Sequence, residues 1–209
     1  MLLGLGTRTA LRQFLLPGAL ASRTATLVPD ATVDALGLGV AALFDRHCNR
    51  QLARVVGDTV TFEGARATYV LPRYPVEALT TIEVQSGFGA AWVTQTAASL
   101  LGRFDEASGL IEFKSLPTTA YGRVRVTWTG GYWVADDGED ASDLPAGATA
   151  LPADLQLLWL NTCQEFWNKR DKLGLALAAA PDQQVAVAKL ELPAGVRQML
   201  APWRRFQLT

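Results

Sequence analysis

The segment from Gly122 to Arg170 constrains the fold of this chain more than any other part of the sequence. It reads GRVRVTWTGGYW, continues through the acidic stretch VADDGEDASD, and ends in LPAGATALPADLQLLWLNTCQEFWNKR. The first part alternates between hydrophobic and polar residues, as a half-buried strand does, whereas the last part is hydrophobic at helical spacing. The sequence therefore predicts a strand, a Gly-Gly turn, a solvated loop and a helix. This segment has no recognisable catalytic pattern and is typical of a protein that presents surfaces to other chains.

The helix predicted over 152–172 carries more hydrophobic residues than one face can hold. Pro152 and Asp154 favour a helix start, since proline suits the first turn and an acid complements the helix dipole there. Leu157, Leu160 and Trp167 lie off the main hydrophobic face, and a surface helix normally has one apolar stripe. The helix is therefore either central in its own domain or shared with a neighbouring subunit. These three residues are candidate subunit-interface residues.

Two further helices are predicted towards the N-terminus, a short one over 7–16 and a long one over 30–52. Asp30 is a plausible N-cap of the long helix. Gly37 and Gly39 lie inside it, and each weakens a helix by about 1 kcal/mol relative to alanine. A helix that keeps both glycines is expected to have close neighbours there or a bend.

The middle of the chain is predicted to be β. Its alternating stretches are bounded by glycine and proline, which is typical of short strands in an antiparallel sheet. These stretches are Thr59–Phe62, Thr81–Val84, Gly109–Phe113 and Arg123–Trp128. The predicted fold class is α+β, in which a helical bundle formed by 30–52 and 152–172 combines with a small antiparallel β-sheet or barrel over about 55–130 and a C-terminal arm. The predicted domains are an N-terminal extension (1–29), a core domain (30–172) and a C-terminal arm with a short helix (173–209).

The bulk charge disfavours several classes of function. The 209 residues include 19 Lys and Arg and 20 Asp and Glu, for a net charge of −1. Because a protein that grips DNA phosphates needs a basic stripe, DNA binding as the main function is disfavoured. The apolar runs are too short to cross a bilayer, so no membrane association is expected. Residues 1–29 contain three arginines and no acid, as a targeting peptide does, but Pro17-Gly18 interrupts the apolar run, and a short helix is the favoured interpretation.

The residues that usually carry chemistry do not converge in this sequence. His47 is the single histidine, and on a helix its side chain diverges from that of Cys48 by about 100°. Two such ligands are too few for zinc, and two cysteines do not make a disulfide framework, so Cys48 and Cys163 are predicted to be reduced and buried. The acidic loop 136–143 lacks the closing Glu of a calcium loop and is predicted to be solvated. No catalytic residue, metal or cofactor is predicted, and the chain is predicted not to be an enzyme.

The C-terminal sequence LPAGVRQMLAPWRRF predicts a helix too short to be stable alone, so it must dock on another surface. That surface belongs either to its own domain or to a partner. Tryptophan and arginine, which are common in binding hot spots, are concentrated here. The candidate partner-binding residues are Met199, Leu200, Trp203, Arg204, Arg205 and Phe206.

Three segments, taken in order, carry a resemblance to a known family. The first is VDALGLGVAALFDRHCNRQL followed by DTVTFEG, the second is YVLPRYPVEALTTIEVQSG, and the third is GRVRVTWTGGYW with LPADLQLLWLNTCQEFWNKRD. With the tail LPAGVRQMLAPWRR, they resemble the bacteriophage head–tail connector family, the adaptor or head-completion proteins that form a ring below the portal. The resemblance spans about residues 31–205.

This resemblance implies a structural virion protein of the neck, assembled in the host bacterial cytoplasm. Such proteins form a ring, typically dodecameric, that extends the portal channel and docks the next tail or head-completion protein. The implied partners are the portal protein, neighbouring copies of the chain and that downstream protein, while DNA passes through the lumen without specific binding. The resemblance also implies that terminal extensions attach to the portal, and by position the candidate is the segment Leu192–Phe206.

Two other functions remain open from the sequence. One is a soluble β-rich ligand- or carbohydrate-binding module that uses exposed Trp92, Trp128 and Trp133, although aromatic residues in a sheet more often belong to the core. The other is an unrecognised hydrolase with two acidic residues that meet in the fold.

Overall fold

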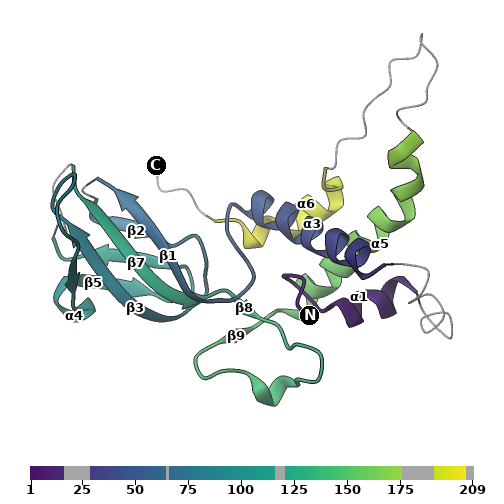
Figure 1. Ribbon diagram of the computed structural model, residues 1–209, viewed down its shortest axis with the longest axis horizontal. Coiled ribbons are helices and arrows are strands. Elements are labelled where there is room, and N and C mark those ends of the chain that lie inside the picture. The colour runs from purple at the N-terminus through teal and green to yellow at the C-terminus, as the bar shows by residue number, and fades with distance from the viewer. Residues whose placement is uncertain (17–28, 65, 116–120, 176–190, 206–209) are drawn as a thin grey trace, which may run out of the picture. The chain divides into compact units, whose positions relative to one another are not determined.

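The computed structural model describes residues 1–16, 29–64, 66–115, 121–175 and 191–205 (Figure 1). Its mixed helices and antiparallel sheets confirm the predicted α+β class, but sheet predominates and a helical bundle is not shown. The chain divides into two compact units, which we call unit 1 and unit 2. Unit 1 consists of Met1–Cys48, Val134–Glu139 and Leu151–Thr209, and unit 2 of Asn49–Trp133 and Asp140–Ala150.

Unit 1 is helical and contains the helices that the sequence pattern predicts. Helices α1, α3 and α5 contact one another pairwise. Helix α3 ends four residues before the predicted boundary because Asn49 adopts a left-handed backbone (φ 52°), which stops a helix. The elements are α1 (Arg8–Leu15), α3 (Asp30–Cys48), α5 (Ala153–Leu175), α6 (Ala194–Met199) and the 3-10 turn η2 (Ala201–Trp203).

The contacts of Gly37 explain one of the two glycines in α3. A Cβ atom added at Gly37 would lie 2.8 Å from Leu3 Cδ1, and one added at Gly6 would lie 2.5 Å from the ring of Trp159. The indole N–H of Trp159 also donates a hydrogen bond to the Gly37 carbonyl oxygen at 3.2 Å. The expected close neighbours are thus confirmed at Gly37, whereas Gly39 faces open space.

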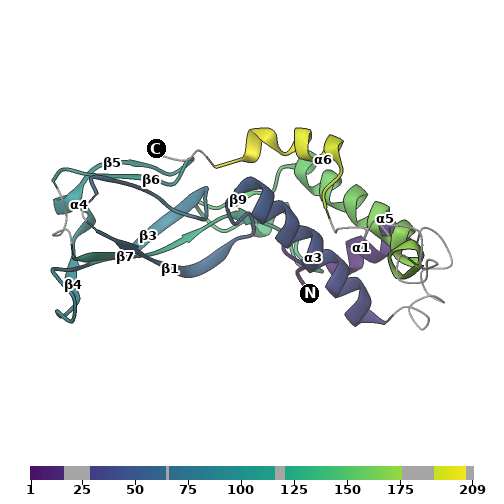
Figure 2. The ribbon, with the colours of Figure 1, turned by 90° about the horizontal axis from the view of Figure 1, so that it is seen from above.

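Unit 2 contains two antiparallel sheets that share one hydrophobic core. The larger has the strand order β1-β7-β3-β4 and the smaller β2-β6-β5, while β8 and β9 form a short parallel pair. Figure 2 shows the sheets as separate layers, with β5 and β6 on one side and β1, β3 and β7 on the other. The elements are β1 (Val55–Glu63), β2 (Thr68–Val70), β3 (Val76–Gln85), β4 (Val93–Gln95), α4 (Ala97–Leu100), β5 (Leu101–Asp105), β6 (Leu110–Phe113), β7 (Arg123–Gly130), β8 (Tyr132–Trp133), η1 (Ala141–Asp143) and β9 (Thr149–Ala150).

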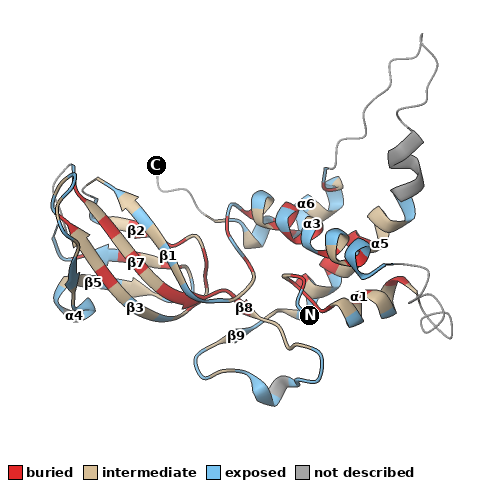
Figure 3. Ribbon diagram, viewed as in Figure 1, coloured by how far each residue is buried: buried red, intermediate tan, exposed pale blue. Residues whose placement is uncertain are grey.

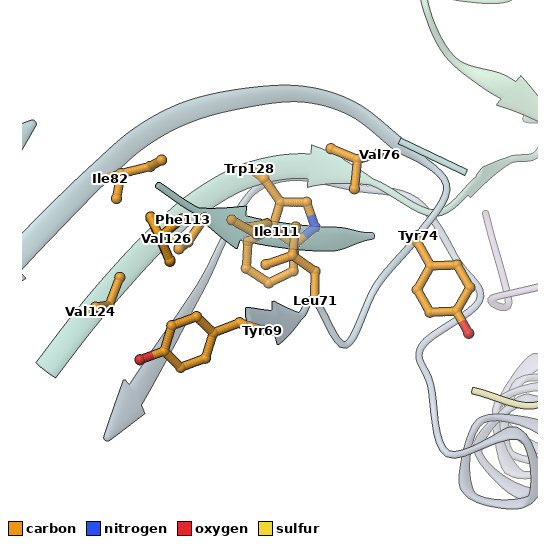
Figure 4. Packing of buried hydrophobic residues seen from close by; sticks show 10 residues of the cluster. All are labelled: Tyr69, Leu71, Tyr74, Val76, Ile82, Ile111, Phe113, Val124, Val126 and Trp128. Atoms are coloured by element: carbon orange, nitrogen blue, oxygen red, sulfur yellow. The ribbon is translucent and has the colours of Figure 1, made fainter. Parts of the chain in front are cut away.

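The core between these sheets contains the alternating residues of β7. Val124, Val126 and Trp128 are fully buried, as the period of two predicts for one face of a strand (Figure 3). They meet Tyr69 and Ile111 from the smaller sheet (Figure 4). Trp128 satisfies its indole N–H by donating to the Arg73 carbonyl oxygen at 3.0 Å, as a buried polar group requires.

The ion pair between Arg8 and Asp34 predicts a pH-dependent contribution of α1 to stability. Arg8 Nε lies 2.6 Å from Asp34 Oδ1, and this hydrogen bond holds the pKa of Asp34 below its usual value. A depressed carboxyl pKa stabilises the fold above the pKa of the unfolded chain, near 4, and this stabilisation is lost as pH falls through the folded-state pKa. Asp34→Asn should therefore lower the urea midpoint at pH 7, and the difference from wild type should shrink as pH falls below about 4.

The matched control for this prediction is Glu165→Gln, which removes the exposed pair with Lys169 on α5. Exposed pairs contribute about 0–1 kcal/mol, so this variant should follow wild type across the same pH range. An Asp34→Asn difference that stays constant from pH 7 to pH 2 would show that the carboxylate charge is not the cause.

Candidate docking surfaces

The described part of the C-terminal tail is fixed to the rest of unit 1 by buried leucine side chains and a backbone hydrogen bond. Leu200 is fully buried, and its N–H donates to the Val196 carbonyl oxygen at 3.0 Å, which closes α6. The N–H of Arg205 donates to the carbonyl oxygen of Cys48 at 2.8 Å, the last residue of α3. The tail therefore docks on its own unit at these points.

The predicted partner-binding residues differ in how far their side chains are exposed. Met199 is 61% exposed, and Arg204 is also exposed, whereas Trp203 is half-buried. Leu200 is fully buried and is not accessible to a partner, and Phe206 lies outside the described residues. The exposed part of this candidate surface therefore consists of Met199 and Arg204, flanked by Trp203. Its role in partner binding stays a prediction.

A pocket of about 360 Å³ lies between the end of α3 and this tail. Arginine is the most frequent residue in its lining, and one glutamate is present. The sequence patterns did not reveal it because its two halves are far apart in the chain. Each half alone has the composition of an ordinary solvated surface. The lining residues are Leu43, Arg46, His47, Glu191, Leu192, Arg197 and Arg204.

Helix α5 keeps exposed hydrophobic surface after unit 1 has packed. Trp159 and Cys163 are fully buried on its inner face. Leu157 is 52% exposed, while Leu160 and Trp167 are half-buried. The three residues that the sequence places off the main hydrophobic face thus remain accessible. Their assignment to a subunit interface stays a prediction.

The tryptophans proposed for ligand binding do not form an exposed set. Trp128 is fully buried in the core of unit 2, so its predicted exposure is wrong; the inward face of β7 takes it into the core. The Trp92 ring stacks on the guanidinium of Arg125, at 4.4 Å from the ring centroid. Trp133 is half-buried.

Two exposed aromatic residues of unit 2 were not predicted from the sequence. Phe88 is 91% exposed in the turn between β3 and β4, and Tyr121 is 85% exposed just before β7. A hydrogen bond from Gln85 Nε2 to the Ala90 carbonyl oxygen at 2.7 Å closes the turn around Phe88. The signal in the sequence is the Gly-Phe-Gly triplet, since a large hydrophobic residue between two glycines has little to pack against.

The residues considered as nucleophiles or metal ligands do not form a reactive or metal-binding group in the described ranges. Cys48 and Cys163 are buried and form no disulfide, as predicted, and burial raises the pKa of Cys163 to about 12, so the reactive thiolate is scarce there. Within the described ranges, no three His, Cys, Asp or Glu residues come close enough to hold a metal ion. In that same part of the chain, no helix has the length and apolar character needed to cross a bilayer.

Comparison with known proteins finds neighbours among solved structures. No family model matches the chain, and no curated protein sequence matches it. The first structural neighbour is a chain in the neck of an empty gene transfer agent (GTA) particle, computed with C6 symmetry, and the second is a chain in the virion of a native GTA particle. The chain shares its fold with both. Each neighbour has a TM-score of 0.60 and 18% identity, and the similarity covers 97% of this chain and 90% of the neighbour.

Proposed function

We propose that this chain is a non-enzymatic structural protein of the neck of a phage-like particle. The observation that carries the proposal is the fold shared with a chain of a GTA particle neck over nearly the whole length of both chains. The three ordered sequence segments point to the same class of protein. Coverage of both units matters here, since a single common unit would occur in many unrelated proteins.

In finer detail, the proposed role is that of a head-to-tail adaptor. Copies of the chain form a dodecameric ring that extends the portal channel and docks the next tail or head-completion protein. A dodecamer is compatible with the sixfold symmetry used for the neighbouring neck structure, because twelve is a multiple of six. A nearly neutral chain suits a channel through which DNA must slide without being held.

Two surfaces are assigned to two different contacts of this adaptor. The exposed side of α5, with Leu157, Leu160 and Trp167, is assigned to the neighbouring subunit, since exposed hydrophobic residues are removed from water there. The tail, with Met199 as its exposed hydrophobic residue, is assigned to the portal protein. Truncating the tail is a poor test because buried Leu200 would be lost with it.

Point substitutions on the two surfaces should separate the two contacts. Met199→Asp should weaken binding of the chain to the portal protein by at least about tenfold, because a buried unpaired carboxylate is costly at an interface. Leu157→Asp should instead reduce ring formation. Portal binding is measured by co-purification and titration, and rings are counted by electron microscopy of the chain mixed with portal.

Each variant is the control for the other, since both place an aspartate at an exposed hydrophobic position. Loss of both properties in one variant, with unchanged folding, would contradict the assignment of separate surfaces. A wild-type chain that neither binds portal nor occurs in purified particles would refute the proposed function itself.

A further inference from the structure

The arginine-lined pocket of unit 1 is built from two segments that are fixed to each other. Arg46 lies in the last turn of α3, Arg197 in the last turn of α6, and Arg204 directly after η2. The hydrogen bond between the Arg205 N–H and the Cys48 carbonyl oxygen ties the second segment to the end of the first. The three arginines therefore line one pocket of a folded unit.

The charge in this pocket is not balanced within the described part of the chain. Elsewhere, arginines are matched with acids, as Arg54 is with Glu77 at 2.8 Å and Arg125 with Glu83 at 2.7 Å. Among the described residues, Arg46, Arg197 and Arg204 have no such ion pair, and Glu191 is the single acid in the lining. Like charges around one pocket repel each other, and an anion that enters removes that repulsion.

The chemistry of the lining favours carboxylates of a protein over a nucleic acid. The planar guanidinium group matches a carboxylate with two parallel hydrogen bonds. Leu43 and Leu192 supply apolar walls, which suit the carbon atoms of a side chain. At about 360 Å³ the pocket holds a few side chains, whereas a DNA backbone needs a row of cations along its length.

A matching pair of carboxylates is presented by the chain itself. Asp140 and Asp143 are exposed at the turn η1, which is held as a capping box. Asp140 Oδ1 accepts from the Ser142 N–H at 2.7 Å, and the Asp140 N–H donates to Asp143 Oδ2 at 2.8 Å. The bonds to Ser142 lower the pKa of Asp140, so its carboxyl is ionised at neutral pH. The bonds that hold this turn use one oxygen of each carboxylate.

We propose that the pocket lined by Arg46, Arg197 and Arg204 binds the Asp140–Asp143 turn of a second copy of this chain. The contact joins two different surfaces, so each copy offers a pocket to one neighbour and a turn to the other. Such a heterologous contact generates a closed ring when its rotation closes. The inference rests on the proposed function, because it names one contact of the proposed ring.

Complementation between two variants of the full chain tests this contact. The pocket variant is Arg197→Glu with Arg204→Glu. The turn variant is Asp140→Asn with Asp143→Asn, which removes the charge and keeps an oxygen acceptor at each position. Sedimentation velocity at low ionic strength should show self-association of wild type and at least about tenfold weaker association of each variant alone. An equal mixture of the two should form one-to-one dimers that do not grow, since one intact pocket meets one intact turn.

The control variant is Arg66→Glu with Arg103→Glu, which makes the same charge change at exposed arginines of unit 2. It should associate as wild type does. Each of three results would overturn the inference: wild type stays monomeric at low ionic strength, the variants associate like wild type, or their mixture remains monomeric. A short DNA oligonucleotide that binds wild type and not the pocket variant would assign the pocket to nucleic acid instead. Rings seen in electron micrographs of the pocket variant with portal would refute this contact and leave the proposed function standing.

Discussion

Replacing Trp159 by alanine is expected to lower the free energy of unfolding by about 3–5 kcal/mol, as large-to-small changes of a buried tryptophan do. The side chain is fully buried on α5, fills the space beside Gly6 and donates its indole N–H to the Gly37 carbonyl oxygen. Its removal leaves a cavity where α1, α3 and α5 meet. It also leaves the Gly37 carbonyl oxygen without the indole N–H that now lies 3.2 Å away. Urea unfolding followed by circular dichroism measures the loss.

Two variants separate the causes of this loss. Trp159→Phe keeps a ring in the cavity and removes the indole donor, so it should cost less than alanine. Leu157→Ala, two residues away on the same helix, removes an exposed side chain and should change stability by less than about 0.5 kcal/mol. A Trp159→Ala protein as stable as Leu157→Ala would contradict the packing described for unit 1.

Replacing Gly131 by alanine is expected to destabilise the fold by about 3 kcal/mol or more, because backbone strain and steric overlap add together. Gly131 has φ +93°, where a side chain is strained, and its Cβ would lie 2.5 Å from the carbonyl oxygen of Ala53. The overlap cannot be relieved by a side-chain rotation, since the atom is backbone. The Gly131 N–H also donates to the Pro75 carbonyl oxygen at 2.7 Å, which holds the residue in place.

The matched control for Gly131 is Gly138, whose φ of +96° is nearly the same. A Cβ added at Gly138 would meet nothing within 4 Å. Gly138→Ala should therefore show the cost of the backbone conformation alone, about 1 kcal/mol. Tryptophan fluorescence during urea unfolding gives both values. Equal losses at Gly131 and Gly138 would mean that the close approach to Ala53 does not matter.

Local patterns in the sequence predict the helices α1, α3, α5 and α6, the strands β1, β3, β6 and β7, and one side of each core, whereas β2, β4, β5, β8 and β9 are not predicted. The alternation in β7 identifies Val124, Val126 and Trp128 as a single buried face, and Pro152 marks the start of α5 within one residue. Such patterns reflect interactions between near neighbours in the chain, so they are readable without knowledge of the fold. The interpretation of Trp128 as an exposed ligand-binding residue failed because burial depends on the second sheet.

The features that the sequence did not predict depend on residues far apart in the chain. Arg50 lies near the end of the helix predicted over 30–52. In the structure it is buried, with its guanidinium 3.7 Å from the centroid of the Tyr74 ring and 5.3 Å from that of Tyr132. A buried cation stacked on aromatic rings has no local periodicity. The arginine-lined pocket is hidden for the same reason, since its members come from α3 and the tail.

The segments that carry the family resemblance turn out to hold structural contacts. In the Leu-Pro-Arg-Tyr-Pro-Val run, Arg73 pairs with Asp58 at 2.8 Å and donates to Gln51 Oε1 at 2.6 Å. The Thr-Gly-Gly-Tyr run contains Gly131, where an added Cβ atom would overlap the backbone of Ala53. Arg73 and Gly131 thus both lie where segments that are distant in the chain contact each other.

The division of the chain has a consequence for its synthesis on the ribosome. Helices α1 and α3 emerge first, but their partner α5 begins only at Ala153, after all of unit 2 has been made. Unit 2 has its core strands in one continuous stretch of nascent chain, whereas the first helices lack the contacts of Trp159 with Gly6 and Gly37 until α5 follows. Domains generally fold as units during translation, so we expect the sheets to form before the helices can bury Trp159. The expected order of folding is therefore the reverse of the order in which the two units begin.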